Sequence, residues 1–366
     1  MTIHRQRGFT LAEVIITVAI IALVSTIALV SYSKVRATAR DSARVSSVNQ
    51  IMTALQLYRN DNKSYPEALI PGQPLTANSV TYMGSIPTSP TPRADGDCED
   101  KDYRYEKTAK GYQITFCLGK DTGTFKKGIT VCENGQCQAG GQLKVADVDG
   151  NEYDTVVIGK QLWLAENYRA KIKPDGTCIN GGGQPPCADA SGADNGLGRS
   201  CMDNNEAHCS NYGALYTWDA AMDGSTTEGA QGICPAGWHV PTTIEHNRLD
   251  KFLNDPSNAN CDDTPAYGNG CPPAGLRLRL GQSSGFNSVW SGYRDTDGSS
   301  FDGFHVVQEE PFDMGGGAAH YWSSTSDGSN AWEHTWAGST TVDSEDAYRI
   351  ESDKGFAYSL RCIKNY

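Results

Sequence analysis

The first 140 residues contain no tryptophan, and residues 141–366 have little positive charge. All seven tryptophans lie in that second part, where 15 Lys and Arg stand against 31 Asp and Glu, compared with 16 against 12 before it. Such different compositions indicate two unlike modules joined in one chain. A protein that binds nucleic acid through its phosphates needs a basic surface. The acidic second module therefore excludes this mode of nucleic-acid binding.

The twelve cysteines include no Cys-x-x-Cys doublet, so the sequence lacks the usual zinc-ribbon and thiol-redox motifs. Four cysteines precede residue 141 and eight follow it, which lets each module pair its own. This usage favours disulfides in an oxidising, extracytoplasmic compartment over reduced, buried thiols. The first module allows three pairings, of which Cys98–Cys117 with Cys132–Cys137 is preferred. In the second module three pairs lie close together across short loops: Cys178–Cys187, Cys201–Cys209 and Cys261–Cys271.

The run from Phe9 to Val30 contains neither glycine nor proline, and Glu13 is its only ionisable side chain. As a helix it spans about 33 Å, enough to cross the hydrocarbon core of a bilayer. The run is too long for the apolar core of a secretory signal peptide and has no small-residue cleavage site after it. Because a carboxylate is unfavourable inside a bilayer, a plain anchor does not explain Glu13.

The segment RQRGFTLAEVIITVAIIALV resembles the N-terminal signature of type IV pilins and type II pseudopilins. The resemblance implies that residues 1–8 are a leader, that a prepilin peptidase cuts between Gly8 and Phe9, and that Phe9 is N-methylated. The fifth mature residue of this family is glutamate, here Glu13. In a filament, Glu13 is then expected to neutralise the Phe9 amine of a neighbour, because each charge would otherwise be desolvated alone.

The long helix is predicted to cover residues 9–62, with residues 9–31 crossing the membrane and the remainder in water. Apolar residues recur there at steps of three or four and leave a polar opposite face, and Pro66 follows the expected end near Asn60–Asn62. Residues 63–138 are predicted to form a small antiparallel β domain on that apolar stripe, and YQITF alternates like a half-buried strand. The expected strands are VTYM, YRYEK, GYQITFCLG and GITVC.

After a short linker at 136–142, the second module is predicted to contain two helices. PTTIEHNRLDKFLNDP has a capping box formed by Thr242 and Glu245, with Ile244, Leu249, Phe252 and Leu253 as its apolar face. YGALYTWDAAM, residues 212–222, places Leu215, Trp218 and Met222 on one side. The remaining sequence is typical of short strands and long loops.

Five blocks between residues 143 and 366 resemble the Fibrobacter major paralogous domain, a secreted module related to C-type-lectin-like folds. The resemblance implies a disulfide-rich α+β head over residues 139–366, closed by a Cys234–Cys362 bond, with the three short-range pairs as loop clips. The expected fold is therefore α+β throughout: a long helix with a small sheet, followed by this head. The blocks are VADVDGNEYDTVVIGKQLWLAENYRA, YGALYTWDAA, ICPAGWHVPTTIEHNRL, YWSSTS with AWEHTW, and GFAYSLRCIKNY.

Calcium-dependent lectins of this fold use a Glu-Pro-Asn or Gln-Pro-Asp tripeptide and a Trp-Asn-Asp segment. This chain has EEPF at 309–312 and no Trp-Asn-Asp, so calcium-bridged sugar binding is not supported. DTDGSSFD supplies weak calcium candidates, because carboxylate oxygens are the ligands that calcium prefers; they are Asp295, Asp297 and Asp302. A turn around Asp149-Gly150 explains DVDGNEYD better than a metal site does. No other cofactor is expected.

No enzymatic activity is expected. Formylglycine-generating enzymes share the general architecture and rely on a reactive cysteine pair, but here every cysteine has a structural partner. The six histidines after residue 200 show no His-Glu-x-x-His spacing, and His239 is interpreted as a packed, hydrogen-bonded residue. Core packing is expected for all the tryptophans, with Trp290 and Trp336 as the two candidates for a binding surface.

The sequence thus predicts a structural subunit of a type IV pilus whose head is an adhesin or recognition module. A minor or tip position is favoured, and a major subunit with outward-pointing heads is the other position considered. The alternative is a pseudopilin of a type II secretion system. The expected partners are other pilin subunits, the prepilin peptidase, the pilus assembly platform and an extracellular ligand such as a glycan or a cell surface. The precursor is expected to cross the inner membrane once, and the assembled subunit to lie outside the cell.

Overall fold

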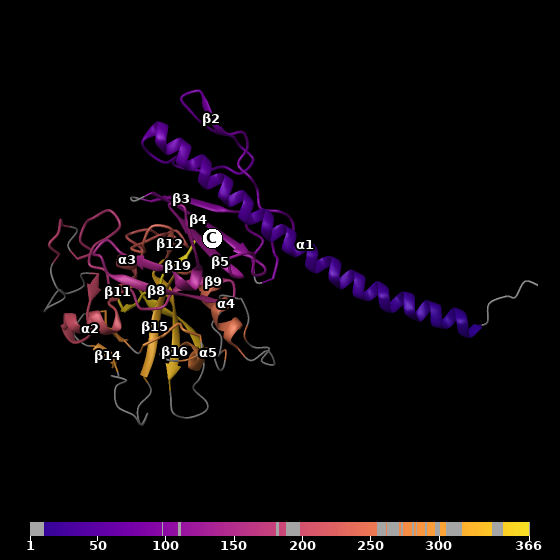
Figure 1. The fold of residues 1–366 in the computed structure, drawn as a ribbon. Coiled ribbons are helices and arrows are strands. Elements are labelled where there is room, and N and C mark those ends of the chain that lie inside the picture. The colour runs from indigo at the N-terminus through magenta and orange to yellow at the C-terminus, as the bar shows by residue number, and fades with distance from the viewer. Residues whose placement is uncertain are drawn as a thin grey trace, which may run out of the picture.

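The protein is a mixed α+β chain in which one long helix projects from a folded body (Figure 1). No membrane-spanning helix is found by length and hydropathy within the part of the chain that the structure describes. This computed structural model describes residues 11–96, 98–108, 111–180, 183–187, 198–254, 261, 271, 274–279, 282, 284–289, 291–296, 301–304, 317–338 and 347–365.

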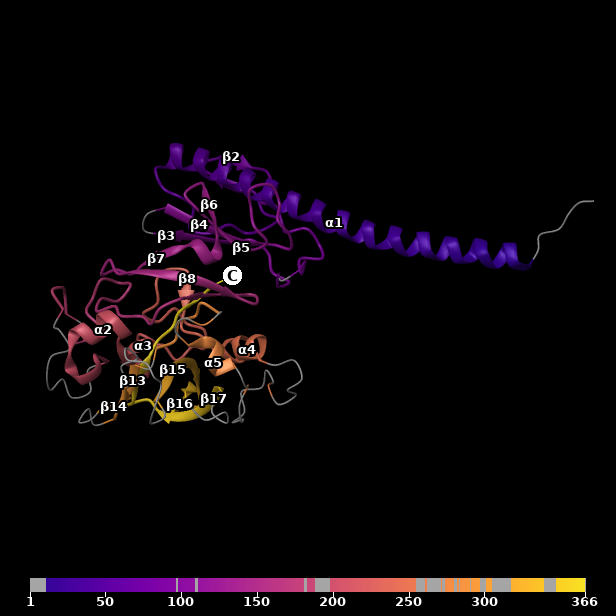
Figure 2. The ribbon, with the colours of Figure 1, turned by 60° about the horizontal axis from the view of Figure 1, so that its bottom comes forward.

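Helix α1 runs without interruption from Leu11 to Asn62 and ends where the sequence predicts. Its first half extends away from the body, whereas the part from Asp41 onward packs against it (Figures 1 and 2). Val48 and Leu55 are buried in a shared apolar core with the strands that follow. The predicted amphipathic second half of the helix is therefore confirmed.

A four-stranded antiparallel sheet, in the order β3-β4-β5-β6, lies across the second half of α1. The preceding hairpin of β1 and β2 forms a separate two-stranded sheet. The four predicted strands correspond to β2, β3, β4 and β5. The bounds are β1 Leu75–Ala77, β2 Val80–Met83, β3 Arg104–Thr108, β4 Gly111–Leu118, β5 Gly128–Glu133 and β6 Gln136–Ala139.

Both faces of this sheet are covered, which differs from the half-buried strand that YQITF predicts. Ile114 and Phe116 of β4 face the core shared with α1. On the other face Thr115 is also buried, and it pairs with Val131 of β5, which belongs to the core of the head. Figure 2 shows the sheet as a layer between α1 and the head. Alternating polarity indicated the two faces correctly, but not that the head would cover the second face through an apolar core that includes Val131.

The expected linker at 136–142 is instead ordered structure. β6 occupies its first four residues, and the 3₁₀ turn η1, Gly140–Gln142, occupies the rest. The Gly140 carbonyl accepts a hydrogen bond from Thr155 Oγ1 at 2.6 Å. A Cβ on Gly140 would stand 3.1 Å from a methyl carbon of Val157. The chain therefore enters the head without a flexible spacer, because the glycines allow close packing there.

The head contains a five-stranded sheet, in the order β12-β19-β9-β8-β7, and an eight-stranded sheet built around β11, β18, β15, β16 and β17. The strands are β7 Lys144–Ala146, β8 Glu152–Ile158, β9 Gln161–Leu164, β10 Arg199–Ser200, β11 Leu215–Thr217, β12 Trp238–His239, β13 Ser291–Arg294, β14 Phe301–Phe304, β15 Gly317–Ser326, β16 Asn330–Gly338, β17 Ala347–Asp353, β18 Ala357–Ser359 and β19 Ile363–Lys364. The helical elements are η2 Met202–Asn204, α2 Glu206–Tyr212, α3 Trp218–Ala221, α4 Thr243–Leu253 and α5 Ala274–Leu278.

The predicted helix at 212–222 is wrong. α2 ends at Gly213, whose φ of 87° is left-handed and suits glycine. The residues Leu215–Thr217 then pair with Ala357–Ser359 of β18 as strand β11, and only the single turn of α3 follows. The apolar spacing of YGALYTWDAA fits a helix locally, but pairing with a strand more than 130 residues later decides the structure.

Helix α4 begins with the predicted capping box, in which Thr242 and Glu245 each accept a hydrogen bond from the other's backbone. Its buried face is only partly the predicted one. Leu249 and Leu253 are buried, but Phe252 is 61% exposed. Polar side chains, among them His246 and Asp250, occupy the remaining buried positions.

All twelve cysteines are joined in disulfides, in the six pairs named from the sequence. Trp336, a candidate for a binding surface, is buried with Trp163, Trp218, Trp238 and Trp322. Trp332, expected in the core, is half-buried. Trp290, the other surface candidate, lies outside the described residues.

Candidate assembly and binding sites

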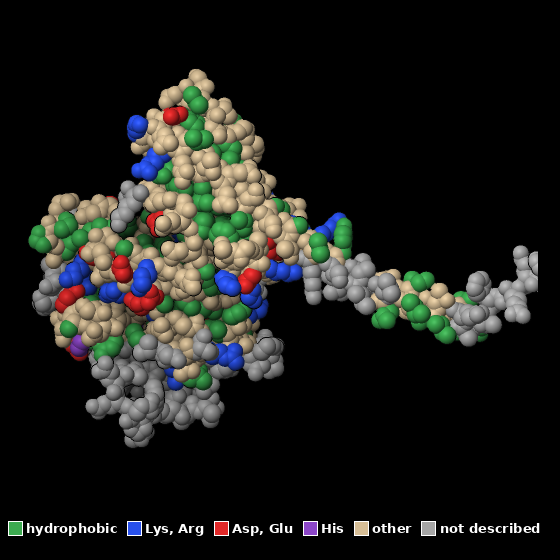
Figure 3. Space-filling view, viewed as in Figure 1, with side chains coloured by type: hydrophobic (Ala, Val, Ile, Leu, Met, Phe, Trp, Pro, Cys, Tyr) green, Lys and Arg blue, Asp and Glu red, His purple; other side chains and the backbone are tan. Residues whose placement is uncertain are grey.

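The projecting half of α1 exposes a dense set of large apolar side chains. Figure 3 shows apolar side chains along this part of the helix, away from the body. Contiguous apolar surface of this kind marks a contact with protein or lipid. The exposed fractions range from 48% to 78% in the set Leu11, Val14, Ile15, Ile16, Val18, Ile20, Ile21 and Leu23.

Of the processing and assembly residues predicted from the sequence, the described part of the chain includes only Glu13, and only its backbone. Gly8 and Phe9 are outside the described residues, and so is the beginning of the predicted span 9–31. Glu13 belongs to the first turn of α1, but its side chain is not among those described. The pairing of Glu13 with a neighbour's Phe9 amine therefore stays a prediction.

A buried charge cluster fixes α1 where it enters the body; we call Arg40, Asp41, Arg44 and Asp95 the neck cluster. Arg44, 1% exposed, contacts Asp41 at 2.6 Å and Asp95 at 2.8 Å. Asp41 also accepts hydrogen bonds from two backbone N–H groups at the end of β4, those of Gly119 and Lys120. The Arg40 hydrogen bond lowers the pKa of Asp95 against the effect of burial. Every charge of the neck cluster thus has a partner of opposite sign.

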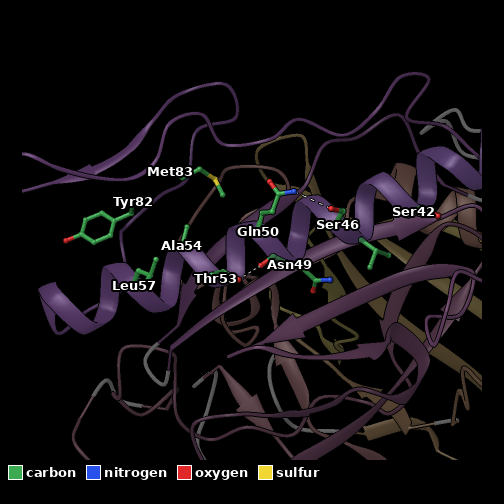
Figure 4. A pocket seen from close by; sticks show the side chains of 10 residues that line it. Ser42, Ser46, Asn49, Gln50, Thr53, Ala54, Leu57, Tyr82 and Met83 are labelled. Carbon is green, nitrogen blue, oxygen red and sulfur yellow. Dashed lines mark hydrogen bonds between the residues drawn. The ribbon is translucent and has the colours of Figure 1, made fainter.

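A groove with a volume of about 590 Å³ runs along the outer side of α1. In Figure 4 the labelled side chains of α1 form one wall, and Tyr82 and Met83 lie across from it. The lining includes no charged side chain, histidine or cysteine, so it offers contact surface rather than acid–base or metal chemistry. The lining residues are Ser42, Val45, Ser46, Asn49, Gln50, Thr53, Ala54, Leu57, Tyr82 and Met83.

The weak calcium candidates of the head are described only in part. Asp295 follows β13 and is half-buried. Asp297 lies outside the described residues, and Asp302 lies in β14 without a described side chain. Because only the Asp295 side chain is described, the calcium site stays a prediction.

The DVDGNEYD segment forms a turn, as the sequence favours. Asp147 accepts hydrogen bonds from Asn151, and from the Tyr153 hydroxyl at 2.7 Å. Asp149 Oδ2 accepts from the backbone N–H groups of Lys171 and Ile172. These carboxylates are occupied by protein donors, which suits a structural turn rather than a cation site.

Among the described residues, one group of possible metal ligands is found, formed by Cys201, Glu206 and Cys209. Its two cysteines are joined to each other in a disulfide. A metal-binding cysteine has to be a thiolate, so this group is better explained by the loop clip. Glu206 instead pairs with the buried Arg199 at 2.9 Å.

His239 and His320 of the head each contact a glutamate. His239 donates from Nε2 to Glu245 at 3.0 Å. Burial alone would raise the pKa of Glu245, but His239 and the Thr242 donors lower it to about 2. His320 donates from Nδ1 to Glu333 at 2.9 Å. His239 is thus the packed, hydrogen-bonded residue that the sequence predicts.

A buried polar group that the sequence analysis missed lies between α4 and β16; we call His246, Asp250, His334 and Trp336 the α4 cluster. The rings of His246 and His334 stack with centroids 4.3 Å apart, and both are fully buried. Asp250 accepts a hydrogen bond from Trp336 Nε1 at 2.9 Å and lies 3.6 Å from His334 Nδ1. The four-residue spacing of His246 and Asp250 was the signal available in the sequence, because it places both on one helix face.

Burial sets the titration of the α4 cluster. It lowers the pKa of both histidines well below the usual 6.5 and raises the pKa of Asp250 to about 6. Arg349, opposite His334 on β17, lowers the pKa of His334 further and opposes the rise at Asp250. The head therefore carries a core group that is sensitive to acid.

Residues 156–364 match the family model of the Fibrobacter succinogenes major domain. The matched range covers more than half of the 366 residues. The chain belongs to this family. Residues 3–29 match the prokaryotic N-terminal methylation motif, as the first resemblance implied. No curated protein and no solved structure matches the chain.

The Fibrobacter succinogenes major domain of this chain contains the α4 cluster, the three loop clips and the Cys234–Cys362 bond. The family match begins within β8, so η1 and β7 precede the matched residues. Both elements nevertheless pack against the matched part of the chain. The methylation motif implies processing by a prepilin peptidase and assembly of a membrane-anchored precursor with pilin-like subunits. The six disulfides indicate that the cysteine-bearing parts lie outside the reducing cytoplasm.

Proposed function

We propose that the protein is a minor or tip subunit of a type IV pilus that displays its head outside the cell. One observation carries the proposal: the methylation motif runs into an uninterrupted helix, α1, whose apolar side chains within the motif are exposed beyond the folded body. Exposed apolar side chains are unfavourable in water, so such a helix is stabilised when other subunits or lipid cover it. A head of this size on every subunit would crowd a filament, which favours the minor or tip position.

The proposal includes a recognition role for the head rather than a catalytic one. Its support is that all twelve cysteines are in disulfides, which leaves no thiolate nucleophile. We assign the head a C-type-lectin-like architecture, supported by the pairing of β19 with β9 and by the Cys234–Cys362 bond that closes the domain. The ligand is a glycan or a cell surface.

Replacing Glu13 tests the assembly part of the proposal. With E13A we expect the subunit to stay in the membrane fraction but to be lost from sheared filaments, because the Phe9 amine has no partner in the filament core. S25A, an exposed position of the same helix, is the matched control. Mass spectrometry should find a mature chain that begins with N-methylated Phe9. Normal filament incorporation of E13A would contradict the register role of Glu13.

Antibody labelling of intact cells separates a pilus from a secretion pseudopilus. A head that is accessible to antibody supports the pilus, while a head that becomes accessible only after the envelope is opened supports the type II secretion alternative. Deleting a gene of the pilus assembly platform should abolish the surface signal.

The ligand is sought with a soluble fragment of residues 36–366, which lacks the exposed half of α1. Binding to a glycan array and to whole cells is measured with and without a chelator. Binding that the chelator abolishes and calcium restores supports the Asp295, Asp297 and Asp302 site, whereas binding unaffected by chelator removes it.

A further inference from the structure

The last strand of the head, β19, carries a buried positive charge whose partners belong to the sheet of β3–β6. The Lys364 side chain is fully buried, and its Nζ lies 2.8 Å from Gln113 Oε1 on β4 and 3.2 Å from Glu106 Oε2 on β3. Burial lowers the pKa of the Lys364 ammonium, and the charge of Glu106 opposes that effect. An ammonium taken out of water is costly unless it is paired. The two sequence regions, more than 250 residues apart, thus depend on each other.

The backbone around Lys364 is shaped for this contact. Lys364 pairs with Trp238 of β12, and the Asn365 N–H donates to the Gly237 carbonyl at 3.0 Å. Gly237 has a φ of 77°, and a Cβ added to it would stand 1.8 Å from Glu106 Oε2. Only glycine leaves room for the Glu106 carboxylate at this point.

Apolar contacts join the same two parts at the other side. Ile129 and Val131 of β5 belong to one core with Leu143, Val145 and Tyr153 of the head. The head is therefore held at two places: where the chain enters it through η1, and where the chain leaves it through β19. A domain held only by its linker would show neither contact.

We infer that residues 363–365, the C-terminal strap, lock the head onto the sheet of β3–β6, so that the two parts keep one orientation and unfold as one unit. This inference is independent of the proposed function, since both surfaces belong to one chain. It also limits where a ligand can bind. The surface at β12 and β19 is committed to the internal contact, so a ligand has to approach the head elsewhere, and the end with β14, β15 and β16 faces away from α1 (Figures 1 and 2).

The single variant E106Q and the double variant E106Q/K364M together test the strap. In E106Q the Lys364 ammonium stays buried without its counter-charge, so amide hydrogen exchange in residues 236–240 and 363–365 should become about 100-fold faster. In the double variant E106Q/K364M no charge is buried, and slow exchange should return. E67Q is the matched control, because its partner Lys107 also lies on β3 but the Glu67 side chain is 85% exposed. The full chain in detergent is used throughout.

Unchanged exchange in E106Q, or exchange in the double variant as fast as in E106Q, would overturn the inference. The wild-type protein supplies a second test that needs no variant. Thermal unfolding of the strands β3–β6 and of the head, each followed by hydrogen exchange of its own peptides, should occur in one transition. Two transitions separated by more than about 10 °C would show that the parts fold independently.

Discussion

The neck cluster and the α4 cluster bury similar groups in opposite ways. In the neck, Arg44 lies between two aspartates, and backbone N–H groups complete the coordination of Asp41. In the head, two neutral imidazoles stack on each other beside Asp250, which accepts a hydrogen bond from Trp336. The difference shows where the molecule resists acid. The neck cluster holds its charges as compensated pairs, whereas the α4 cluster keeps its two histidines neutral and leaves Asp250 with a raised pKa.

The largest expected effect comes from breaking the neck cluster. R44M should lower the free energy of unfolding by about 3–5 kcal/mol, because Asp41 is left as an uncompensated buried charge and Asp95 keeps only Arg40 as a partner. The measurement is chemical denaturation followed by hydrogen exchange of α1 and β4. R59M, at an exposed position of the same helix, should change stability by less than about 1 kcal/mol. A loss as small as that of R59M would show that the neck charges are solvated.

The second expectation concerns Asp250. D250N keeps an acceptor for Trp336 but removes a buried charge whose pKa is raised to about 6. At pH 7.5 the variant should therefore be more stable than the wild type by about 1–3 kcal/mol. Thermal unfolding at that pH measures the change. D219N, in the exposed first turn of α3, serves as a control. A destabilised D250N would mean that Arg349 and His334 more than compensate the carboxylate.

The smallest expected effect is the pH dependence of the free energy of unfolding of the head. Its direction follows from the pKa shifts of the α4 cluster. His246 and His334 have lowered pKa values in the folded head, so their contribution to its free energy of unfolding is complete above pH 6.5. This contribution is lost as the pH falls, because the unfolded chain then binds more protons than the folded one. Asp250, with its pKa raised to about 6, binds a proton in the folded state below that pH and so offsets part of this loss. The head should thus become less stable as the pH falls below 6.5, by about 1.4 kcal/mol per pH unit for each net proton taken up on unfolding. The lowered pKa of Asp95 protects the neck until the pH falls below about 3.8.

The variant H334F sharpens this expectation. Without one of the two histidines, fewer protons are taken up on unfolding below pH 6.5, so the loss of stability with falling pH should be smaller than in the wild type. H208F, at a half-buried position outside the cluster, serves as the control. Stability measured at pH 7.5, 6, 5 and 4 gives the slope directly. An unchanged slope in H334F would assign the acid sensitivity to other groups.

Local features were predictable because their causes are neighbours in the sequence. The capping box of α4 depends on two residues three apart, and the end of α1 on the residues before Pro66. The strands β2 to β5 follow from alternation and turns. By contrast, β11 needed its distant partner β18, and the half-buried YQITF strand needed the head to cover its second face. Sequence patterns show which side chains share a face of a strand, but they do not show whether water or a distant part of the chain covers that face.

The sequence alone determined that an apolar methylation-type helix precedes two disulfide-bonded modules, because the signature, the charge contrast and the cysteine spacing are all written along the chain. The tertiary structure decided how the modules meet. Lys364 finds Gln113 and Glu106, and His246 finds His334, only after the chain folds back on itself. The free energy of a buried polar group depends on its partners in space, and no linear pattern specifies which distant residue will supply them.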